Sequence, residues 1–360
     1  MLKAAKQSVL RVLRGCGAFQ AIKDSAWRTN RLLILCFHGI AQEDEHLWRP
    51  GLYMPPGLFQ QRLEMLKRGD YNVLPLSDAL GRVRSGDLPP RSVVLTFDDG
   101  GVDFYRVAFP LIKTYGFPAT VYQTTYYSDH QGPVFNLMLS YLLWKRRGTI
   151  LQRGRELGLP ETMDLTTEQS RAEIVVKLVL QAEDQGLTGM QKHDLTIRLA
   201  RLLDIDYDEL HQKRLLQLMN RREIEELAGR GIDFQLHTHR HRTPIHEVLF
   251  RREIRDNRAS LAKSGVNAVH FCYPSGVHRG EYLAWLEAEG VVSATTCDAG
   301  MVTSNSNPLL LPRFVDTSDR TPIDFEAWLT GVGSLLAFRT AAHAVPPPAA
   351  GRASHAAVAD

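Results

Sequence analysis

Two groups of side chains with the chemistry of metal ligands stand out in the sequence. Asp98 and Asp99 are adjacent and precede two glycines, and His237 and His241 lie four positions apart in the stretch HTHRH. Two neighbouring carboxylates repel each other unless a cation compensates their charge. If a helical turn begins at Thr238, the two histidines stand one turn apart and can share one metal ion. Two histidines and one aspartate leave metal positions open, which is typical of a catalytic metal site.

An apolar run leads into each group. Residues 92–97 (SVVLTF) are β-branched and apolar, which predicts a buried parallel strand that ends at Asp98, and residues 232–236 precede His237 in the same way. Catalytic groups gather at the carboxyl ends of such strands. The ordinary alternative is a helix N-cap with a solvated acid for the aspartates and hydrogen-bonded surface histidines for the second group.

The same alternation of strands and helices extends along the chain. Further apolar runs at 32–37, 72–76, 268–273 and 291–295 predict strands, and Phe59, Leu63 and Leu66 predict a helix capped at Gly69. This order implies a parallel sheet covered by helices, either open or closed into a barrel. Helical patterns replace strand patterns between about 127 and 221, which predicts a helical insertion. A last helix is expected over 325–338, followed by a disordered Ala/Pro-rich tail at 341–360.

The composition limits which binding partners and which cellular compartment we expect for the protein. A net charge of +3 over 360 residues gives no argument for nucleic acid as a partner. The four cysteines are widely spaced, which favours reduced thiols in a cytoplasmic protein. No apolar run approaches the roughly 20 residues that span a bilayer. Arg11 and Arg14 interrupt the stretch that a secretory signal would need, so we expect no export by that route.

Residues 1–30 predict a basic amphipathic N-terminal helix. Leu2, Val9, Val12 and Leu13 recur at helical spacing among lysines and arginines. Two interpretations stay open, namely packing of this helix on the main domain and peripheral docking on an anionic membrane surface at the inner membrane face.

Two motifs give the sequence a resemblance to a known family. Residues 96–100 (TFDDG) and 237–241 (HTHRH) match two motifs of the polysaccharide deacetylases that carry the NodB homology domain, carbohydrate esterase family 4. Residues 37–39 (FHG) and 271–276 (FCYPSG) also look like family positions. The resemblance covers roughly 30–126 and 222–320, so 31–340 is expected to be one catalytic domain that contains the insertion.

The resemblance implies an α/β fold, a distorted (β/α) barrel, and removal of N- or O-acetyl groups from a saccharide. Asp99, His237 and His241 would bind a divalent metal ion, with zinc expected first and cobalt, nickel or iron compatible with the same ligands. Asp98 would act as general base toward the attacking water.

In the segment Tyr273, Pro274 and Ser275, the resemblance implies contact with the substrate. A backbone N–H near Ser275 would stabilise the oxyanion.

Two positions depart from the family pattern. Cys272 stands where the family often has an arginine that orients the catalytic aspartate, and Arg313 stands where the family often has a histidine that protonates the leaving group. Arginine cannot donate a proton at neutral pH, so Arg313 would orient Asp98 or stabilise the oxyanion instead.

The proton donor is therefore open between His38, His239 and His278. Asp298 is a candidate for tuning a histidine.

We therefore expect a cytoplasmic or membrane-surface hydrolase that acts on carbon–nitrogen bonds other than peptide bonds, with an acetylated saccharide or glycan precursor as substrate. Two alternatives stay open. One is an amidohydrolase that acts on a non-sugar amide, because the insertion could reshape the cleft. The other is a catalytically weak carbohydrate-binding protein of the same fold.

Overall fold

The computed structural model describes residues 2–130 and 132–336, with side chains from residue 5 onward. These residues form two compact units. One contains the residues up to Asp129 and from Leu218 onward, and the other is His130–Gln217. The second unit occupies most of the segment in which an insertion is expected. The tail expected at 341–360 lies outside the described residues.

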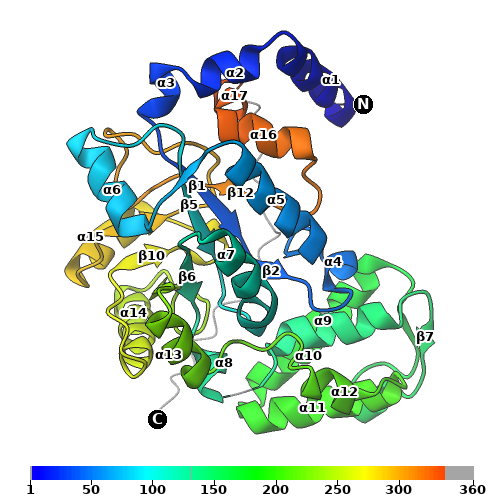
Figure 1. The fold of residues 1–360 in the computed structure, drawn as a ribbon. Coiled ribbons are helices and arrows are strands. Elements are labelled where there is room, and N and C mark those ends of the chain that lie inside the picture. The colour runs from blue at the N-terminus through cyan, green and yellow to red at the C-terminus, as the bar shows by residue number, and fades with distance from the viewer. Residues whose placement is uncertain (1, 131, 337–360) are drawn as a thin grey trace. The chain divides into compact units, whose positions relative to one another are not determined.

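A parallel sheet forms the centre of the first unit (Figure 1). Within the described residues its strand order is β11-β10-β9-β6-β5-β1-β12, with β4 also paired to β5, and all neighbours run parallel. The strands are β1 (Leu33–Phe37), β4 (Asn72–Val73), β5 (Ser92–Phe97), β6 (Thr120–Gln123), β9 (Asp233–Leu236), β10 (His270–Cys272), β11 (Ser293–Thr295) and β12 (Phe314–Val315).

One segment joins the two edges of this sheet. Leu311 pairs with Thr295 beside β11, and three residues later Phe314 pairs with Leu35 of β1. The sheet therefore curls around on itself, which confirms the expected α/β fold of a distorted barrel.

Helices cover this sheet and build most of the second unit. In the first unit they are α1 (Leu2–Gly15), α2 (Ala18–Lys23), α3 (Ala26–Thr29), α4 (Glu45–Trp48), α5 (Pro56–Arg68), α6 (Leu76–Ser85), η1 (Phe104–Ala108), α7 (Phe109–Tyr115), α8 (Tyr126–His130), α13 (Arg221–Gly229), α14 (Glu247–Ala262), η3 (Pro274–Gly276), α15 (Gly280–Ala288), α16 (Pro322–Thr330) and α17 (Val332–Leu335), beside the short strand pair β2 (Gly39–Ile40) and β3 (Tyr53–Met54). The second unit has α9 (Phe135–Lys145), β7 (Ile150–Leu151), η2 (Gly154–Leu157), β8 (Met163–Asp164), α10 (Glu168–Asp184), α11 (Gly189–Leu202) and α12 (Tyr207–Gln212).

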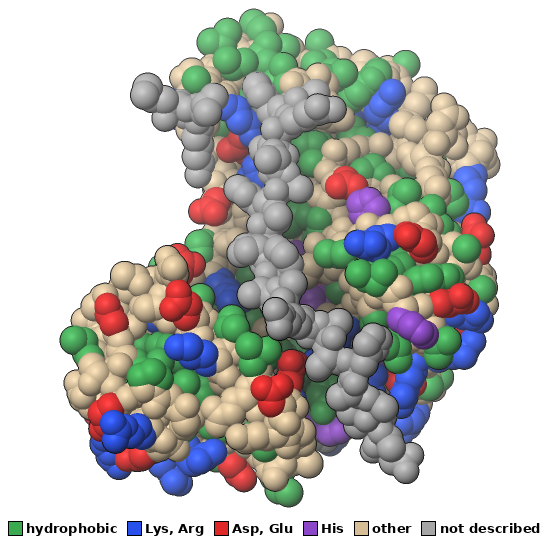
Figure 2. Space-filling model, turned by 180° about the vertical axis from the view of Figure 1, so that it is seen from behind, with side chains coloured by type: hydrophobic (Ala, Val, Ile, Leu, Met, Phe, Trp, Pro, Cys, Tyr) green, Lys and Arg blue, Asp and Glu red, His purple; other side chains and the backbone are tan. Residues whose placement is uncertain are grey.

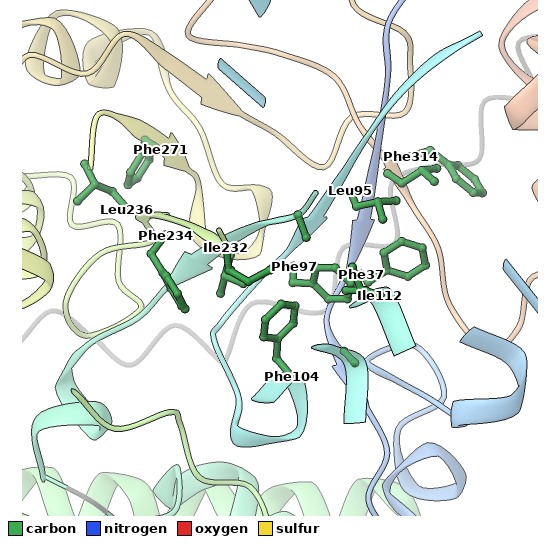
Figure 3. Close-up of a cluster of buried hydrophobic side chains, with 14 of the residues drawn as sticks. Phe37, Leu95, Phe97, Phe104, Ile112, Ile232, Phe234, Leu236, Phe271 and Phe314 are labelled. Carbon is green, nitrogen blue, oxygen red and sulfur yellow. The ribbon is translucent and has the colours of Figure 1, made fainter. Parts of the chain in front are cut away.

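An aromatic cluster fixes the ends of the neighbouring strands β1 and β5 (Figure 3). Every residue of β1 and β5 is buried, as expected for parallel strands covered on both faces. The rings of Phe37 and Phe97 stack 5.4 Å apart, and the Phe97 ring also meets Phe104 at 4.8 Å. Because His38 and Asp98 directly follow these anchored phenylalanines, their backbone positions are held by the core.

Three expected elements differ from the structure. The single helix expected over 1–30 is wrong, because the first helix ends at Gly15. Gly17 then adopts a left-handed conformation (φ 82°), and a second, short helix begins after it. The helix expected over 325–338 begins earlier and is interrupted at Gly331, where φ is 95°. The strand expected over 72–76 stops at Val73, and α6 begins after Pro75 because proline fits the start of a helix.

The N-terminal helix α1 packs on α16. Leu10 of α1 is buried against Ile323 and Ala327, while Val9 and Val12 of the same helix are 44% and 69% exposed. Among the described residues, no helix combines the length and the apolar character that crossing a bilayer requires.

Candidate active site

Asp99, His237 and His241 meet at the carboxyl end of the sheet. Their ligating atoms all lie within 4.8 Å of one another. The Oδ1 atom of Asp99 is 3.4 Å from Nε2 of His237 and 3.3 Å from Nε2 of His241. Asp99 and His241 both have positive φ, 70° and 54°, a backbone strain that persists where the surrounding structure enforces it and that is frequent at functional sites.

The loop after β9 brings the two histidines together without a helix. No helical turn begins at Thr238, because Thr238 and His241 take left-handed backbone conformations and residues 239–241 form a bend. The Thr238 hydroxyl accepts a hydrogen bond from the N–H of Arg242 at 3.0 Å, which ties the loop into a compact turn. The rings of His237 and His241 lie 4.9 Å apart as a result.

Hydrogen bonds orient His237 for metal binding. Its Nδ1 lies 2.8 Å from the carbonyl oxygen of Cys272, and a carbonyl can only accept, so Nδ1 carries the hydrogen and Nε2 keeps its lone pair on the side of Asp99. The backbone N–H of His237 donates to Oδ1 of Asn257 on α14 at 2.9 Å. Asn257 is fully buried, and its amide also donates to Gln123 and Thr125.

Sequence reasoning missed Asn257. The signal that could have revealed it is a polar amide on the core-facing side of a helix.

The donor set of this triad fits a divalent metal ion. Two imidazole nitrogens and one carboxylate oxygen suit zinc and similar transition metals. Within the described residues, two other groups of donors meet within the same distance, namely Cys36 with His38 and Asp98, and Asp98 with His237 and Cys272. Both include Asp98, whose two oxygens already accept hydrogen bonds from Arg313, so the Asp99 triad fits a metal better.

Asp98 forms a buried, two-pronged ion pair with Arg313. The Nη1 and Nη2 atoms of Arg313 each donate to one carboxylate oxygen of Asp98 at 2.8 Å. Burial raises the pKa of Asp98, but the adjacent guanidinium outweighs this effect and holds the pKa well below its usual range. Arg313 is fully buried and donates further to Thr296 and Thr96, so it orients Asp98 and cannot reach a substrate.

Thiols occupy the space around this ion pair. The Sγ atom of Cys272 lies 3.1 Å from Nη2 of Arg313 and 3.4 Å from Oδ2 of Asp98, and Sγ of Cys36 lies 3.5 Å from the same oxygen. Burial raises the pKa of Cys272 well above its usual range, so the thiol stays neutral. Because the side chain of Cys272 is small and neutral, it leaves room for the guanidinium group of Arg313.

The segment after β10 offers one free backbone donor among its three expected residues. The N–H of Tyr273 donates to Thr295 and its hydroxyl donates to Leu309, while Pro274 has no N–H. Ser275 is exposed with φ 56°, and no hydrogen bond within the described part of the chain uses its N–H. Of the three, Ser275 has the backbone N–H that is available to a further acceptor.

The three candidate histidines have different surroundings, and Figure 2 shows that several histidine side chains (purple) reach the surface. Nε2 of His38 lies 3.8 Å from Oδ2 of Asp98. His239 is held by Thr125 at 2.8 Å, and burial lowers the pKa of its imidazole. Nε2 of His278 lies 3.7 Å from Oδ2 of Asp298, so the structure pairs the expected tuning acid with this histidine.

Comparisons with known proteins agree with this geometry. The sequence model of the family "Polysaccharide deacetylase" matches residues 85–175, which include Asp98 and Asp99. The chain is 30% identical over 103 residues to a putative polysaccharide deacetylase, YxkH, from Bacillus subtilis, a match that covers 27% of this chain and 35% of that protein. It is 26% identical over 99 residues to the poly-β-1,6-N-acetyl-D-glucosamine N-deacetylase of Escherichia coli, covering 27% of this chain and 14% of that protein. The chain thus spans about a third or less of the length of these relatives.

Solved structures show the same fold over most of the chain. The Streptococcus pyogenes deacetylase PplD, solved in complex with acetate, superposes with a TM-score of 0.54 at 20% identity and covers 81% of this chain and 95% of that one. IcaB from Ammonifex degensii superposes with a TM-score of 0.50 at 16% identity, and the match covers 84% of this chain and 97% of that one. The matched motifs, the fold and the relatives agree, and residues 85–175 of the chain are similar to the polysaccharide deacetylase family.

Proposed function

We propose that the chain is a metal-dependent hydrolase that removes acetyl groups from a saccharide, with N-acetyl groups as the first target. The observation that carries the proposal is the pairing of the ionised, buried carboxylate of Asp98 with a neighbouring triad of metal donors. A binding module has no need for a carboxylate that Arg313 orients and keeps ionised beside such a triad. The relatives matched over part of their length include N-deacetylases of poly-β-1,6-N-acetyl-D-glucosamine, which supports an acetylated amino sugar as substrate.

Each residue of the site has a separate task in this reaction. Asp99, His237 and His241 would hold a divalent ion, whose Lewis acidity polarises the acetyl carbonyl and acidifies the attacking water. Asp98 accepts the proton of that water, and Arg313 fixes the direction of its carboxylate. The N–H of Ser275 donates to the oxygen that gains negative charge.

Zinc is the ion that we propose for this site. Catalytic zinc is frequently bound by histidine and carboxylate side chains that leave part of its coordination sphere open, as two histidines and one aspartate would here. Cobalt, nickel and iron use the same donors, so metal analysis of the purified protein decides between them.

Acetate release tests the proposed reaction. The metal-loaded protein is incubated with a β-1,6-linked N-acetylglucosamine oligosaccharide, and free acetate and free amines are measured with and without a chelator. We expect both products in equal amounts and their loss after chelation. Release of acetate from simple acetamides but not from the saccharide would favour the amidohydrolase alternative, and saccharide binding without product would favour a binding protein.

We further propose that the chain acts in the cytoplasm at an anionic membrane surface, through α1. The face of α1 that does not pack on α16 carries Val9, Val12 and Arg11, all exposed, which suits shallow insertion beside anionic headgroups. The cysteines are free thiols, which supports a reducing compartment.

Sedimentation with vesicles tests this contact. Wild-type protein should co-sediment with vesicles that contain anionic lipid at low salt, and Val9→Glu should weaken this binding. Val292→Glu is the matched control, because Val292 is 47% exposed and lies outside α1. Equal sedimentation of both variants with wild type would remove α1 as the contact.

A further inference from the structure

Cleavage of an acetamide needs a proton donor as well as a base. An amine leaves an acyl carbon slowly unless its nitrogen is protonated as the carbon–nitrogen bond breaks. Asp98 takes up a proton and Arg313 cannot release one at neutral pH. If the proposed function holds, another side chain at the carboxyl end of the sheet must supply this proton.

His278 and Asp298 lie at that end of the sheet, beside residues that hold Asp98 and His237 in place. His278 follows β10 and Asp298 follows β11, the neighbouring strand. The carbonyl oxygen of Asp298 accepts the backbone N–H of Arg313 at 2.9 Å, so the loop with Asp298 is tied to the residue that binds Asp98. The ring of His278 lies 5.7 Å from that of Tyr273, which directly follows the carbonyl that orients His237.

Close packing links the His278 loop to the same ion pair. An added Cβ at Gly276 would lie 2.7 Å from Cβ of Cys297, so the backbone of this loop rests directly on Cys297. The Sγ atom of Cys297 in turn lies 3.9 Å from Nη2 of Arg313.

The environment of His278 suits a proton donor. Its Nδ1 lies 3.0 Å from the carbonyl oxygen of Gly276 and therefore donates to it, which fixes the ring. Its Nε2 lies 3.7 Å from Oδ2 of Asp298, so a protonated ring gains a negative partner. The side chain is 32% exposed, which leaves it accessible to a substrate.

The other histidines near these strands are less suitable. His38 lies next to the base Asp98 itself, with 3.8 Å between Nε2 of His38 and Oδ2 of Asp98. His239 is half-buried and its Nδ1 is hydrogen-bonded to the hydroxyl of Thr125. His270 is at the opposite end of β10, where Ser77 and Ser293 occupy both ring nitrogens.

We propose that His278 is the catalytic proton donor of the deacetylation and that Asp298 positions it. Water loses one proton to Asp98, and its oxygen forms the new bond to the acetyl carbon. The carbon–nitrogen bond then breaks as Nε2–H of His278 gives its proton to the amine nitrogen. Acetic acid and the amine leave, and the amine takes up the proton that the acid releases as it becomes acetate. The proton held by Asp98 passes through solvent to restore His278, so one water is consumed for each acetyl group.

Two substrates with different leaving groups test this role. An N-acetylglucosamine oligosaccharide needs a protonated leaving group, whereas 4-nitrophenyl acetate releases a stable phenolate without one. The variants are His278→Gln, Asp298→Asn and His38→Gln, with His246→Gln as control because His246 is exposed and its side chain makes no capping bond on α14. Rates on both substrates, metal content and melting temperature are measured for each.

His278→Gln should lose about 100-fold or more of kcat on the saccharide and change less than about threefold on the aryl ester, with metal content unchanged. Asp298→Asn should show a smaller loss with the same selectivity. Equal losses on both substrates in His278→Gln would reveal a structural role for His278. A selective loss on the saccharide in His38→Gln alone would assign the proton donor to His38. Either result overturns the proposal. Failure of the proposed function is distinct, since wild-type protein would then release no acetate from the saccharide.

Discussion

Replacement of Arg313 by methionine removes the partner of the buried Asp98 carboxylate. The two side chains are 0% and 3% exposed and share two hydrogen bonds of 2.8 Å. Removal of one member of such a buried pair costs about 3–5 kcal/mol of the free energy of unfolding, because the other charge stays without compensation. For a unit of this size that loss lowers the melting temperature by roughly 6–20 °C. We also expect loss of acetate release, since Asp98 loses its orientation and, below its raised pKa, its ionised state.

The pH dependence of this loss follows from the pKa of Asp98. In the wild-type protein Arg313 holds this pKa below its usual range, so the ion pair stabilises the fold at neutral pH and is lost only as Asp98 is protonated in strong acid. In the variant, burial is the largest remaining influence on this carboxyl and raises its pKa, against smaller lowering effects from His38 and His237. The variant's ionised carboxylate then destabilises the fold at pH 8, and this cost disappears as pH falls through the raised pKa. The difference in melting temperature between the two proteins should therefore narrow from pH 8 to pH 5.

A second buried ion pair provides the control. Arg62 and Asp316 are both fully buried, with 2.8 Å between Nε and Oδ2, and they lie outside the site. Arg62→Met should also lose stability while the folded fraction keeps its acetate release within about threefold, because the Arg62 side chain binds Asp316 and Arg320 and not Asp98 or the metal triad. The reasoning is refuted if Arg313→Met melts like wild type, or if its stability deficit stays the same from pH 8 to pH 5.

Other predictions concern the metal triad and its support. His237→Ala and His241→Ala should each lower the bound metal and the rate together, which metal analysis by mass spectrometry and acetate release check; full metal content in either variant would remove that ligand. Asn257→Ala should weaken metal affinity by about 10–100-fold, because outer hydrogen bonds fix the orientation of metal ligands. Competition with a fluorescent chelator measures this change, and an unchanged affinity would limit Asn257 to a structural role. Chelation of the wild-type protein should lower its melting temperature, and re-added zinc should restore it, because a ligand of the folded state stabilises that state.

Sequence patterns predicted the parts of the fold in which one local signal dominates. The run at 92–97 is apolar and β-branched throughout, and β5 has the same bounds. By contrast, β6 lies between β5 and β9 at the centre of the sheet but escaped prediction, because Thr120 and Gln123 form its two ends and leave an apolar run of only two residues. The two residues of β12 are defined only by pairing with β1, which no local pattern encodes.

Spatial partners were the part of the site that the sequence could not supply. The motifs indicated Asp98, Asp99, His237 and His241, but the partner of Asp98 lies 215 positions away along the chain. The sequence left two roles open for Arg313, and only the burial of its side chain separates orientation of Asp98 from contact with the oxyanion. The bend that joins His237 to His241 depends on left-handed residues, which a helical-spacing argument cannot foresee.

The central claim is that Asp98 is the base beside a metal held by Asp99, His237 and His241. Its most direct test is acetate release by Asp98→Asn, a change that keeps the size of the side chain, measured together with metal content. We predict a loss of about 100-fold or more in rate with metal content equal to that of wild type. Acetate release at the wild-type rate by a fully metal-loaded Asp98→Asn protein would contradict the account.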